Sequence, residues 1–463
     1  MNKRPTAIFI ALAAWFLLVL LACTLSNSSE PPTLVPQASA TPPPTIGYST
    51  LAPNQYPQQA TQLSPAVAPP DTTLLNLMNQ VDADRMFVNI DALANMQTRR
   101  VNSSSATPGV GIDAAADYVL KQFNAIRDQS YQNSFSVLTQ DFPINWDNMQ
   151  STGRNIIGIL SGTDVGGGVY VIGAHYDSIN YNFNDPTGYA PGADDNATGV
   201  AALLEIARIM SQHRHRATIM FVAFSAEEIQ RMGSKAFVSD YLQANNISVN
   251  AMLNMDIIGS DTGPDGSIDD KDLRLYSADP NESTSRQLAR EMNLIGARMD
   301  PAMKLIVEGT VDRANRYSDH MSFSDAGYPA VRFVEADEEI NREHSERDTI
   351  DDVQAGYLVN ATQSILVCLT ALADGPRPPQ NVDLRQNSDG TRTLHWEPSP
   401  GAAGYVVALR QPDGLFYSDY FETSDTSVTW DGFVASRYTA LAIAAVDSSG
   451  LMGPLSQEFT ITS

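Results

Sequence analysis

The fold is decided by two segments, Val169-Tyr-Val-Ile-Gly-Ala-His-Tyr-Asp-Ser178 and Pro191-Gly-Ala-Asp-Asp-Asn-Ala-Thr-Gly199. The apolar run at the start of the first segment is typical of a buried strand, and His175 and Asp177 follow at its end. The second segment holds an acidic turn around Asp195 and leads into a helix-like stretch. Open α/β sheets build their sites at the edge where the strands end. The two segments therefore predict an imidazole and carboxylates at that edge.

Segments typical of strands and of helices alternate on both sides of this stretch. Predicted strands cover residues 134–142, 155–160, 169–174, 218–224, 251–258 and 330–334. Predicted helices cover residues 112–126, 200–210, 282–298 and 353–373, after a helical pattern that begins at residue 72. This alternation predicts an α/β domain over residues 72–373, with a mixed, mainly parallel sheet flanked by helices.

The region after a Pro-rich linker at residues 374–379 has a different pattern. About seven short alternating segments with turn residues between them predict a small all-β sandwich over residues 379–463. Pro379, Trp396, Tyr405 and the Tyr438 strand resemble a fibronectin type III domain. We expect Trp396 and Tyr438 to lie in its core. The domain could hold a polymer, a partner or the cell wall, or space the enzyme from a surface.

The composition narrows the classes of function. The chain has 463 residues, a formal net charge of −24 and a pI near 4.5, so nucleic acid is not an expected partner. Its two cysteines, Cys23 and Cys368, imply no disulfide framework. Cys368 lies on the apolar face of a predicted helix, where a buried free thiol is expected.

The amino terminus predicts export. Lys3 and Arg4 precede a short apolar run, as in a secretory signal, and Leu20-Leu-Ala-Cys23 resembles the bacterial lipobox. We read residues 1–23 as a signal peptide and residues 24–71, rich in Pro, Ser and Thr, as a disordered tether. The predicted location is the cell surface or outer envelope, with a lipid anchor at Cys23. An uncleaved anchor helix and ordinary signal cleavage are the alternatives, and both also export the chain.

Three later residues complete a metal-binding set of five. The five residues all follow predicted strands or lie in loops: His175, Asp195, Glu228, Asp256 and His344. Two imidazoles with three carboxylates suit Zn²⁺. The charges of two Zn²⁺ ions would be neutralised by the three carboxylates and one hydroxide. Without metal, the carboxylates would be crowded like charges, which is costly. The set therefore predicts two zinc ions per chain.

Residues 75–373 resemble the co-catalytic di-zinc metallopeptidase family of secreted bacterial leucyl aminopeptidases and glutamate carboxypeptidase. The resemblance is carried by five motifs in order: Gly173-Ala-His-Tyr-Asp-Ser178, Pro191-Gly-Ala-Asp-Asp-Asn-Ala-Thr-Gly199, Phe224-Ser-Ala-Glu-Glu228, Leu253-Asn-Met-Asp-Ile-Ile-Gly259, and His344 before Asp348-Thr349. It implies that Asp195 bridges the two ions. It also implies that His175 and Asp256 complete one ion, and that Glu228 and His344 complete the other.

The same resemblance implies roles for residues that do not bind metal. Asp177 would orient His175, and the peptide bond after Asp195 is often cis in this family. Glu227 would be the general base, which takes a proton from a metal-bridging water and later gives it to the leaving amine.

The predicted function is therefore an exported, zinc-dependent aminopeptidase that hydrolyses the first peptide bond of substrates with a free amino terminus. Carboxypeptidase activity is one alternative, left open by Arg313, Arg316 and Arg332 near the pocket region. Glutaminyl-cyclase-like activity is another, although retention of all five ligand positions argues against this single-zinc branch. A catalytically inactive surface binding protein is the contrasting class, and an intact Glu227 argues against it.

Other polar groups have simpler interpretations. We expect His320 to line the pocket or to be structural, not to bind metal. His213 and His215 are predicted in a solvated turn. The segment from Asp261 to Asp272 has the composition of a calcium-binding loop, but an acidic surface loop is the preferred interpretation.

Overall fold

The computed structural model describes residues 72–103, 107–146, 149–182, 185–299, 303–313 and 316–462. The predicted signal peptide and lipobox at residues 1–23, with Cys23, and the predicted tether at residues 24–71 lie outside this described part of the chain.

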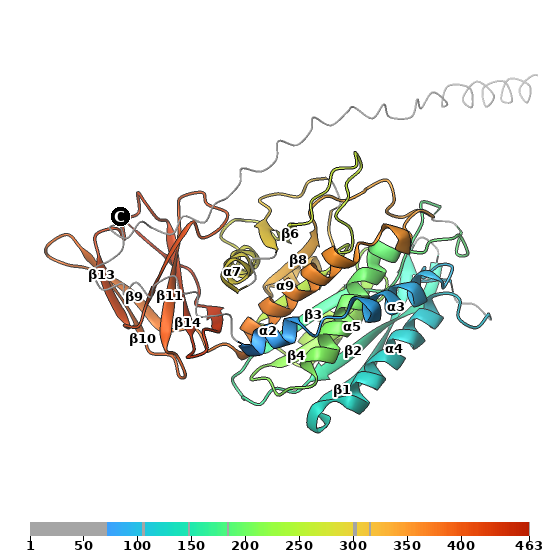
Figure 1. The fold of residues 1–463 in the computed structure, drawn as a ribbon, viewed down its shortest axis with the longest axis horizontal. Coiled ribbons are helices and arrows are strands. Elements are labelled where there is room, and N and C mark those ends of the chain that lie inside the picture. Colours follow the sequence, from blue (N-terminus) through green and yellow to red (C-terminus); the bar gives the residue numbers. More distant parts are fainter. Residues whose placement is uncertain are drawn as a thin grey trace, which may run out of the picture. The chain divides into compact units, whose positions relative to one another are not determined.

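Eight strands form one mixed sheet in the order β1-β2-β4-β3-β5-β8-β6-β7 (Figure 1). Their bounds are β1 Phe135–Trp146, β2 Met149–Leu160, β3 Val169–His175, β4 Thr218–Phe224, β5 Ala251–Met255, β6 Asp272–Ser277, β7 Lys304–Val307 and β8 Ala330–Glu335. The four central strands, β4, β3, β5 and β8, are parallel. Antiparallel pairing occurs between β1 and β2, β2 and β4, and β8 and β6. The predicted mixed, mainly parallel sheet is confirmed.

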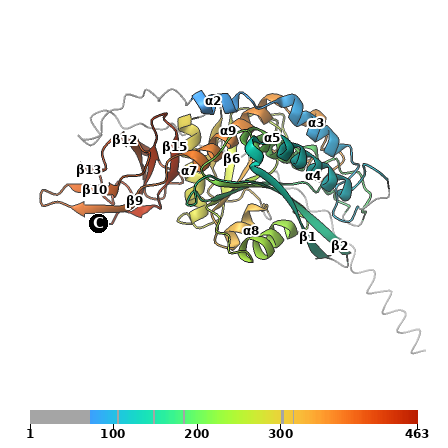
Figure 2. The ribbon, with the colours of Figure 1, turned by 90° about the horizontal axis from the view of Figure 1, so that it is seen from below.

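Helices cover both faces of this sheet (Figure 2). Helices α3, α4, α5 and α9 lie on one face, and α8 lies on the other. The bounds of the helices are α2 Thr72–Met78, α3 Ala83–Ala94, α4 Ile112–Gln129, α5 Gly199–Met210, α6 Met232–Ala236, α7 Thr284–Met299, α8 His320–Asp325 and α9 Ala355–Asp374. Shorter helical turns are η2 Tyr131–Asn133, η3 Ala193–Thr198, η4 Phe237–Gln243 and η5 Ile350–Asp352. This arrangement is the predicted α/β architecture.

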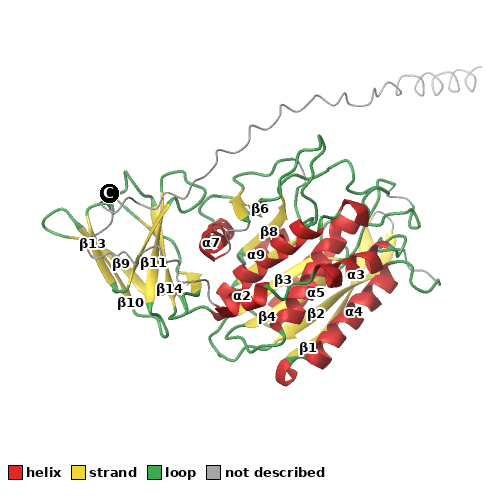
Figure 3. Cartoon of the chain, viewed as in Figure 1, coloured by secondary structure: helices red, strands yellow, loops and turns green. Residues whose placement is uncertain are grey.

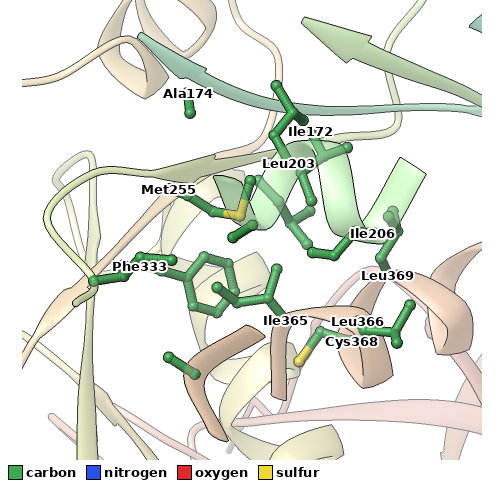
Figure 4. Packing of buried hydrophobic residues seen from close by; sticks show 14 of the residues in the cluster. Ile172, Ala174, Leu203, Ile206, Met255, Phe333, Ile365, Leu366, Cys368 and Leu369 are labelled. Atoms are coloured by element: carbon green, nitrogen blue, oxygen red, sulfur yellow. The ribbon is translucent and has the colours of Figure 1, made fainter. Parts of the chain in front are cut away.

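The centre of the core lies between the parallel strands and two helices (Figure 4). Side chains of β3, β5 and β8, such as Ile172, Met255 and Phe333, meet Leu203 of α5 and Ile365 of α9. Among the described residues, α9 is the one helix long and apolar enough to cross a membrane. Because 72% of its apolar stretch is buried in the protein, it is accounted for as a core helix. Cys368 of this helix is a buried free thiol, as predicted.

Some elements of the fold were not predicted from the sequence. These are strands β6 and β7, helix α8, and the helical segment of α6 and η4. Strand β6 alternates Leu273 and Leu275 with polar residues, and β7 has four residues at the sheet edge. Such short or polar-rich segments lack the continuous apolar run that identified the central strands.

The prediction that His215 lies in a solvated turn is wrong. The residue is 2% exposed. Its Nδ1 lies 2.7 Å from a carboxylate oxygen of Asp374, and its Nε2 lies 2.8 Å from the Met210 carbonyl oxygen. Asp374 is 159 residues away in sequence, so the polar surroundings of His215 gave no sign of this partner. His213 is exposed, as expected.

The acidic segment from Asp261 to Asp272 folds back on itself through a bridge between Thr262 and Ile268. Its carboxylates accept hydrogen bonds from nearby backbone N–H groups. The Asp265 carboxylate accepts from Ser267, and the Asp269 carboxylate accepts from both Lys271 and Asp272. Local turn formation therefore accounts for these acidic residues.

The carboxyl-terminal region consists of two antiparallel sheets (Figure 3). One has the strand order β13-β10-β9, and the other has the order β12-β11-β14-β15, with β16 beside β14. The bounds are β9 Gln380–Gln386, β10 Arg392–Glu397, β11 Gly404–Arg410, β12 Asp419–Thr423, β13 Ser427–Trp430, β14 Ala440–Val446, β15 Met452–Leu455 and β16 Phe459–Thr460. Trp396 and Tyr438 are fully buried in this region, which agrees with the predicted core.

Strand β11 is buried along its whole length because both of its faces are covered. Tyr405, Val407 and Leu409 belong to the core of the two antiparallel sheets. Val406 and Ala408 point the other way, into the same apolar cluster as α7 and α9. The alternating side chains of one strand therefore contribute to two cores, which joins this region to the α/β region.

A buried carboxyl group lies at this junction. Glu291 of α7 is 7% exposed, and its Oε1 accepts a hydrogen bond of 2.8 Å from the Leu455 N–H of β15. Burial raises the pKa of Glu291 from an ordinary value of 4.5 to about 8. A carboxyl whose pKa is raised on folding favours the folded state below pH 4.5, and this contribution is lost as the pH rises to 8.

Glu291→Gln is therefore expected to flatten the pH dependence of stability. From the pKa change, the contribution of Glu291 to the unfolding free energy of the wild type should fall by about 4 to 5 kcal/mol between pH 4.5 and pH 8 or above. Glutamine keeps an acceptor for the Leu455 N–H and cannot ionise. Denaturant unfolding at pH 5 to 8 should show the variant gaining stability over the wild type as the pH rises. Glu282→Gln, at an exposed position, is the control. The prediction would be contradicted if the unfolding free energies of Glu291→Gln and the wild type changed with pH in parallel.

Candidate metal centre

The parallel strands bring three of the predicted ligands to one edge of the sheet. His175 is the last residue of β3, Asp256 directly follows β5, and Glu228 lies four residues after the end of β4. Because these strands are parallel neighbours, their carboxyl ends lie at the same edge. His175 and Asp256 are buried, and Glu228 is partly buried.

Asp195 reaches the same place from a tight turn before α5. The turn spans Ala193–Thr198, and its backbone is not helical at Asp195 and Asn196. The Asp195–Asn196 peptide bond is cis, as the family resemblance implied. The Asn196 side chain fastens the turn to the end of β5. Its Nδ2 donates to the Met255 carbonyl at 2.9 Å, and its Oδ1 accepts from Gly199 at 3.0 Å.

His344 comes from the loop after β8 and has a positive φ of 52°. Its carbonyl oxygen accepts a hydrogen bond from the Tyr181 N–H at 3.0 Å, and the two rings meet edge to face. Its side chain is 31% exposed, whereas that of His175 is 1% exposed. The opening to solvent is therefore on the His344 side.

The five side chains form two groups that share Asp195. In one group, His175 Nε2 lies 3.2 Å from Asp195 Oδ1 and 3.3 Å from Asp256 Oδ1. In the other, His344 Nε2 lies 3.2 Å from Asp195 Oδ2 and 2.9 Å from Glu228 Oε2. Each oxygen of one carboxylate thus faces a different imidazole.

The donor atoms fit a metal ion. Ligand atoms of His175, Asp195 and Glu228 all lie within 4.8 Å of one another. The second carboxylate oxygen of Glu228, Oε1, is buried and has no hydrogen-bond partner among the described residues. Imidazole nitrogen and carboxylate oxygen are the donors that Zn²⁺ takes in catalytic sites. A buried carboxylate oxygen without a hydrogen-bond partner is costly, so its position beside imidazole nitrogens is expected of a residue that binds a metal ion.

The electrostatics of the two imidazoles show how strongly negative this edge is. Burial opposes a charge on His175, but Asp256, Asp177 and Asp195 raise its pKa well above the usual range. Glu228 and Asp195 raise the pKa of His344 to about 12. Both rings are therefore cations when no metal is bound. Because zinc binds neutral imidazole, binding must release protons and compete with them.

Glu227 lies beside the ligands and is held by Asp177. The Asp177 carboxylate accepts the backbone N–H groups of Glu227 at 3.1 Å and Glu228 at 3.3 Å. The carbonyl oxygen of Asp177, rather than its carboxylate, is the nearest partner of His175 Nδ1, at 3.2 Å against 3.7 Å. Asp177 thus positions both the imidazole and the start of the glutamate pair. Burial, together with nearby Asp319, raises the pKa of Glu227 well above the usual range.

The three arginines considered as carboxylate binders have partners within the protein. Arg332 is 2% exposed and lies 3.2 Å from Asp256 Oδ2. Arg313 pairs with Glu343 at 2.9 Å, and Arg316 pairs with Glu338. His320 is buried on α8 and does not belong to the metal-binding group. Burial, with the positive charges of Arg332 and Arg231, lowers the pKa of His320 to about 3, so it is neutral.

Asp348 holds the turn that carries Asp195, and the sequence analysis gave it no role. Its two carboxylate oxygens accept the N–H groups of Asp194 at 2.7 Å and Asp195 at 3.0 Å. Asp348 was part of the motif that includes His344, but the backbone N–H of Asp195 that it accepts lies 153 residues away in the sequence. A carboxylate that accepts two N–H groups fixes the orientation of a turn, as groups behind a metal ligand commonly do.

A mainly parallel sheet with imidazoles, carboxylates and a partly buried glutamate at its carboxyl edge defines a metal-dependent hydrolase site. Residues 155–369 match the model of the peptidase family M28. Two similar curated proteins are fungal and are named "Probable zinc metalloprotease". The one from Pyrenophora tritici-repentis is 28% identical over 78% of this chain and 90% of its own length. The one from Phaeosphaeria nodorum is 29% identical over 78% of this chain and 82% of its own length.

Solved structures show the same fold. LapB from Legionella pneumophila has a TM-score of 0.52 at 21% identity, over 65% of this chain and 74% of its own. The LapA aminopeptidase of the same organism has a TM-score of 0.51 at 17% identity, over 64% and 73%. A glutaminyl cyclase from Porphyromonas gingivalis has a TM-score of 0.50 at 18% identity, over 62% and 98%. Together, the comparisons show that the chain is similar to peptidase family M28 over residues 155–369 and to proteins named as probable zinc metalloproteases, and that its α/β region has the fold of these solved structures.

Proposed function

We propose that this chain is an aminopeptidase that binds two zinc ions and removes the amino-terminal residue of peptides. The observation that carries the proposal is the sharing of Asp195. One of its oxygens faces His175 with Asp256, and the other faces His344 with Glu228. A single carboxylate between two sets of donors is the arrangement expected of a bridging ligand in a two-metal site.

In this proposal each zinc ion has three protein ligands. His175, Asp195 and Asp256 hold one ion, and Glu228, His344 and Asp195 hold the other. Zinc bound there would act as a Lewis acid, which polarises a carbonyl group and lowers the pKa of water. Asp177 keeps the His175 ring in place through its carbonyl oxygen, so that Nε2 faces the metal.

Glu227 is the proposed general base. It takes the proton of the attacking water and returns it to the amine of the leaving peptide. Its partly buried position supports this role, because loss of solvent raises the pKa of Glu227 and so makes its carboxylate a better proton acceptor. The two N–H groups fixed by Asp177 hold Glu227 beside the ligands during the transfer.

Recognition of a carboxyl terminus is less well supported. A carboxypeptidase needs a positive group that is free to pair with the terminal carboxylate of its substrate. Arg313, Arg316 and Arg332 are already paired with internal carboxylates.

We further propose that the protein is exported and held at the cell surface through Cys23. This rests on the sequence of residues 1–23, and the tether at residues 24–71 would separate the enzyme from the membrane. The carboxyl-terminal sheets, proposed as a fibronectin type III-like domain, share a core with α7 and α9. Any polymer or surface partner would therefore meet a domain that is packed on the enzyme, not one that is loosely tethered.

The test of the activity is hydrolysis of a panel of amino-acid nitroanilides by the purified full-length protein, with zinc measured on the same samples. We expect turnover only on substrates with a free amino group, at about two zinc ions per chain. Removal of zinc with a chelator should abolish turnover, and added zinc should restore it.

The comparison substrates are the same peptides with a blocked amino terminus and peptides that begin with glutamine. Release of the last residue from blocked peptides would replace the proposal with a carboxypeptidase. Cyclisation of amino-terminal glutamine would replace it with a glutaminyl cyclase. Absence of both zinc and turnover would leave a surface binding protein.

A further inference from the structure

A buried arginine lies behind the metal-binding edge. Arg99, between α3 and α4, is 0% exposed. Its guanidinium group donates hydrogen bonds to four backbone carbonyl oxygens: Leu93 at 3.2 Å, Tyr176 at 2.7 Å, Gly192 at 2.8 Å, and Pro191. A buried cation is costly unless its donors are satisfied, so this set of four acceptors must be assembled on folding.

Three of the four acceptors, Tyr176, Pro191 and Gly192, belong to the two segments that decide the fold, and Leu93 belongs to α3. Tyr176 lies between His175 and Asp177 at the end of β3, and Gly192 lies three residues before Asp195. One planar guanidinium group therefore spans the segment that carries the first imidazole and the segment that carries the shared carboxylate. Arginine suits this task because its donors have a fixed planar arrangement.

Ser178 makes a second connection between the same segments. Its Oγ accepts a hydrogen bond of 3.0 Å from the Arg99 N–H and donates one of 2.8 Å to the Ala190 carbonyl oxygen. The segment around Arg99 thus holds the two metal-bearing segments through both its side chain and its backbone.

Gly192 shows how close this contact is. Its φ is +55°, and a Cβ atom there would lie 2.8 Å from Arg99 Nη2 and 2.5 Å from the Asp195 carbonyl oxygen. Any larger residue would push the guanidinium group away from the turn that carries Asp195. The positive φ and the close approach both require glycine at this position.

The charge of Arg99 faces the ligands without touching them. Asp348, Asp177 and Asp195 are the carboxylates that act on the guanidinium group electrostatically. Burial lowers the pKa of Arg99 to about 10, which leaves it positive at neutral pH. Within the described residues, the hydrogen bonds of the Arg99 guanidinium group go to backbone carbonyl oxygens, so its fixed charge offsets the negative edge from behind.

We propose that Arg99 is a positioning residue that sets the spacing between the His175 segment and the Asp195 turn, and thereby the affinity of the site for zinc. The inference rests on the proposed function for the identity of the metal. It is separable from the aminopeptidase activity, because zinc affinity is measured without any substrate.

The test compares wild type, Arg99→Lys and Arg99→Ala in the full-length protein, with exposed Arg85→Lys on α3 as the matched control. Zinc affinity is measured by competition with a fluorescent chelator, and kcat and KM are measured on the best nitroanilide. Arg99→Lys keeps the charge but loses the planar fork. We expect it to bind zinc about 10- to 100-fold more weakly. At saturating zinc we expect a lower kcat with KM unchanged within about threefold.

Arg99→Ala adds a readout that a general folding role would not give. It leaves a cavity with four carbonyl acceptors, into which a guanidinium ion fits. Millimolar guanidinium, well below denaturing concentrations, should restore zinc affinity to Arg99→Ala and leave wild type and Arg85→Lys unchanged. Equal amounts of methylammonium should restore less, because it cannot satisfy the four acceptors.

Two results would overturn the proposal. One is wild-type zinc affinity in folded Arg99→Lys, and the other is a loss in Arg99→Ala that guanidinium does not restore. If neither variant folds, Ser178→Ala decides the question, because it removes only the second connection. A loss of zinc affinity of about three- to tenfold supports the proposal, and no loss rejects it. Zinc binding by wild type without aminopeptidase turnover would reject the proposed function and leave this test intact.

Discussion

Glu227→Gln is expected to lower kcat on a nitroanilide substrate by about 10²- to 10⁴-fold while the zinc content stays at the wild-type level. Glutamine matches the size of glutamate but cannot accept a proton. The residue belongs to neither group of imidazoles and carboxylates around Asp195, so its loss should leave the metal in place. KM should change little, because the base acts on the attacking water rather than on substrate binding.

The matched control for this prediction is Glu346→Gln, an exposed glutamate two residues after His344. It should keep full activity and full zinc content. Glu227→Gln with wild-type kcat would reject the proton-transfer role. A variant that has lost zinc together with activity would show instead that Glu227 contributes to the metal site.

The central part of the fold could be predicted from the sequence because each of its strands is buried on both faces. Strands β3, β4 and β5 read as continuous apolar runs, and the predicted ranges differ from the observed ones mainly at the ends. Strand β6 alternates apolar and polar residues, and the edge strand β7 has only four residues, so neither has such a pattern. The sequence also indicated the all-β region, because turn residues separate its short strands.

The candidate ligands could be predicted for a related reason. Each of His175, Glu228 and Asp256 follows an apolar run, so finding the strand also finds the residue at its end. Asp195 and His344 lie in loops, and only their motifs pointed to them. The structure brings all five together at one edge of the sheet.

The residues that support the ligands could not be predicted in this way. Asp348 holds backbone N–H groups 153 and 154 residues away, and Arg99 holds carbonyl oxygens up to 93 residues away. Both bind backbone groups, which are the same in every residue type, so the sequence at the other end carries no sign of the contact. Arg332 was one of three arginines that left the carboxypeptidase alternative open, and the structure pairs it with Asp256 inside the protein. Such contacts depend on the folded backbone and appear only with it.

Asp195→Ala is expected to remove both zinc ions and nearly all activity, by about a thousandfold or more. Each of its oxygens serves a different imidazole, so the substitution takes one ligand from both groups at once. His175→Ala and His344→Ala each take a ligand from only one group. We therefore expect each histidine variant to retain about one zinc ion per chain after dialysis, and Asp195→Ala to retain almost none.

The pattern across these three variants tests the number of ions more directly than the zinc content of wild type, which a weakly bound surface ion can raise. If one ion were bound by His175, Asp195 and Glu228, the group whose ligand atoms lie within 4.8 Å, then His175→Ala would lose all zinc. His344→Ala would then keep its ion. With two ions, we expect instead that each histidine variant loses one zinc ion. Asp195→Ala should then lose as much zinc as the two histidine variants lose together. Because His344 is the more exposed imidazole, its ion should exchange faster with a chelator in wild type.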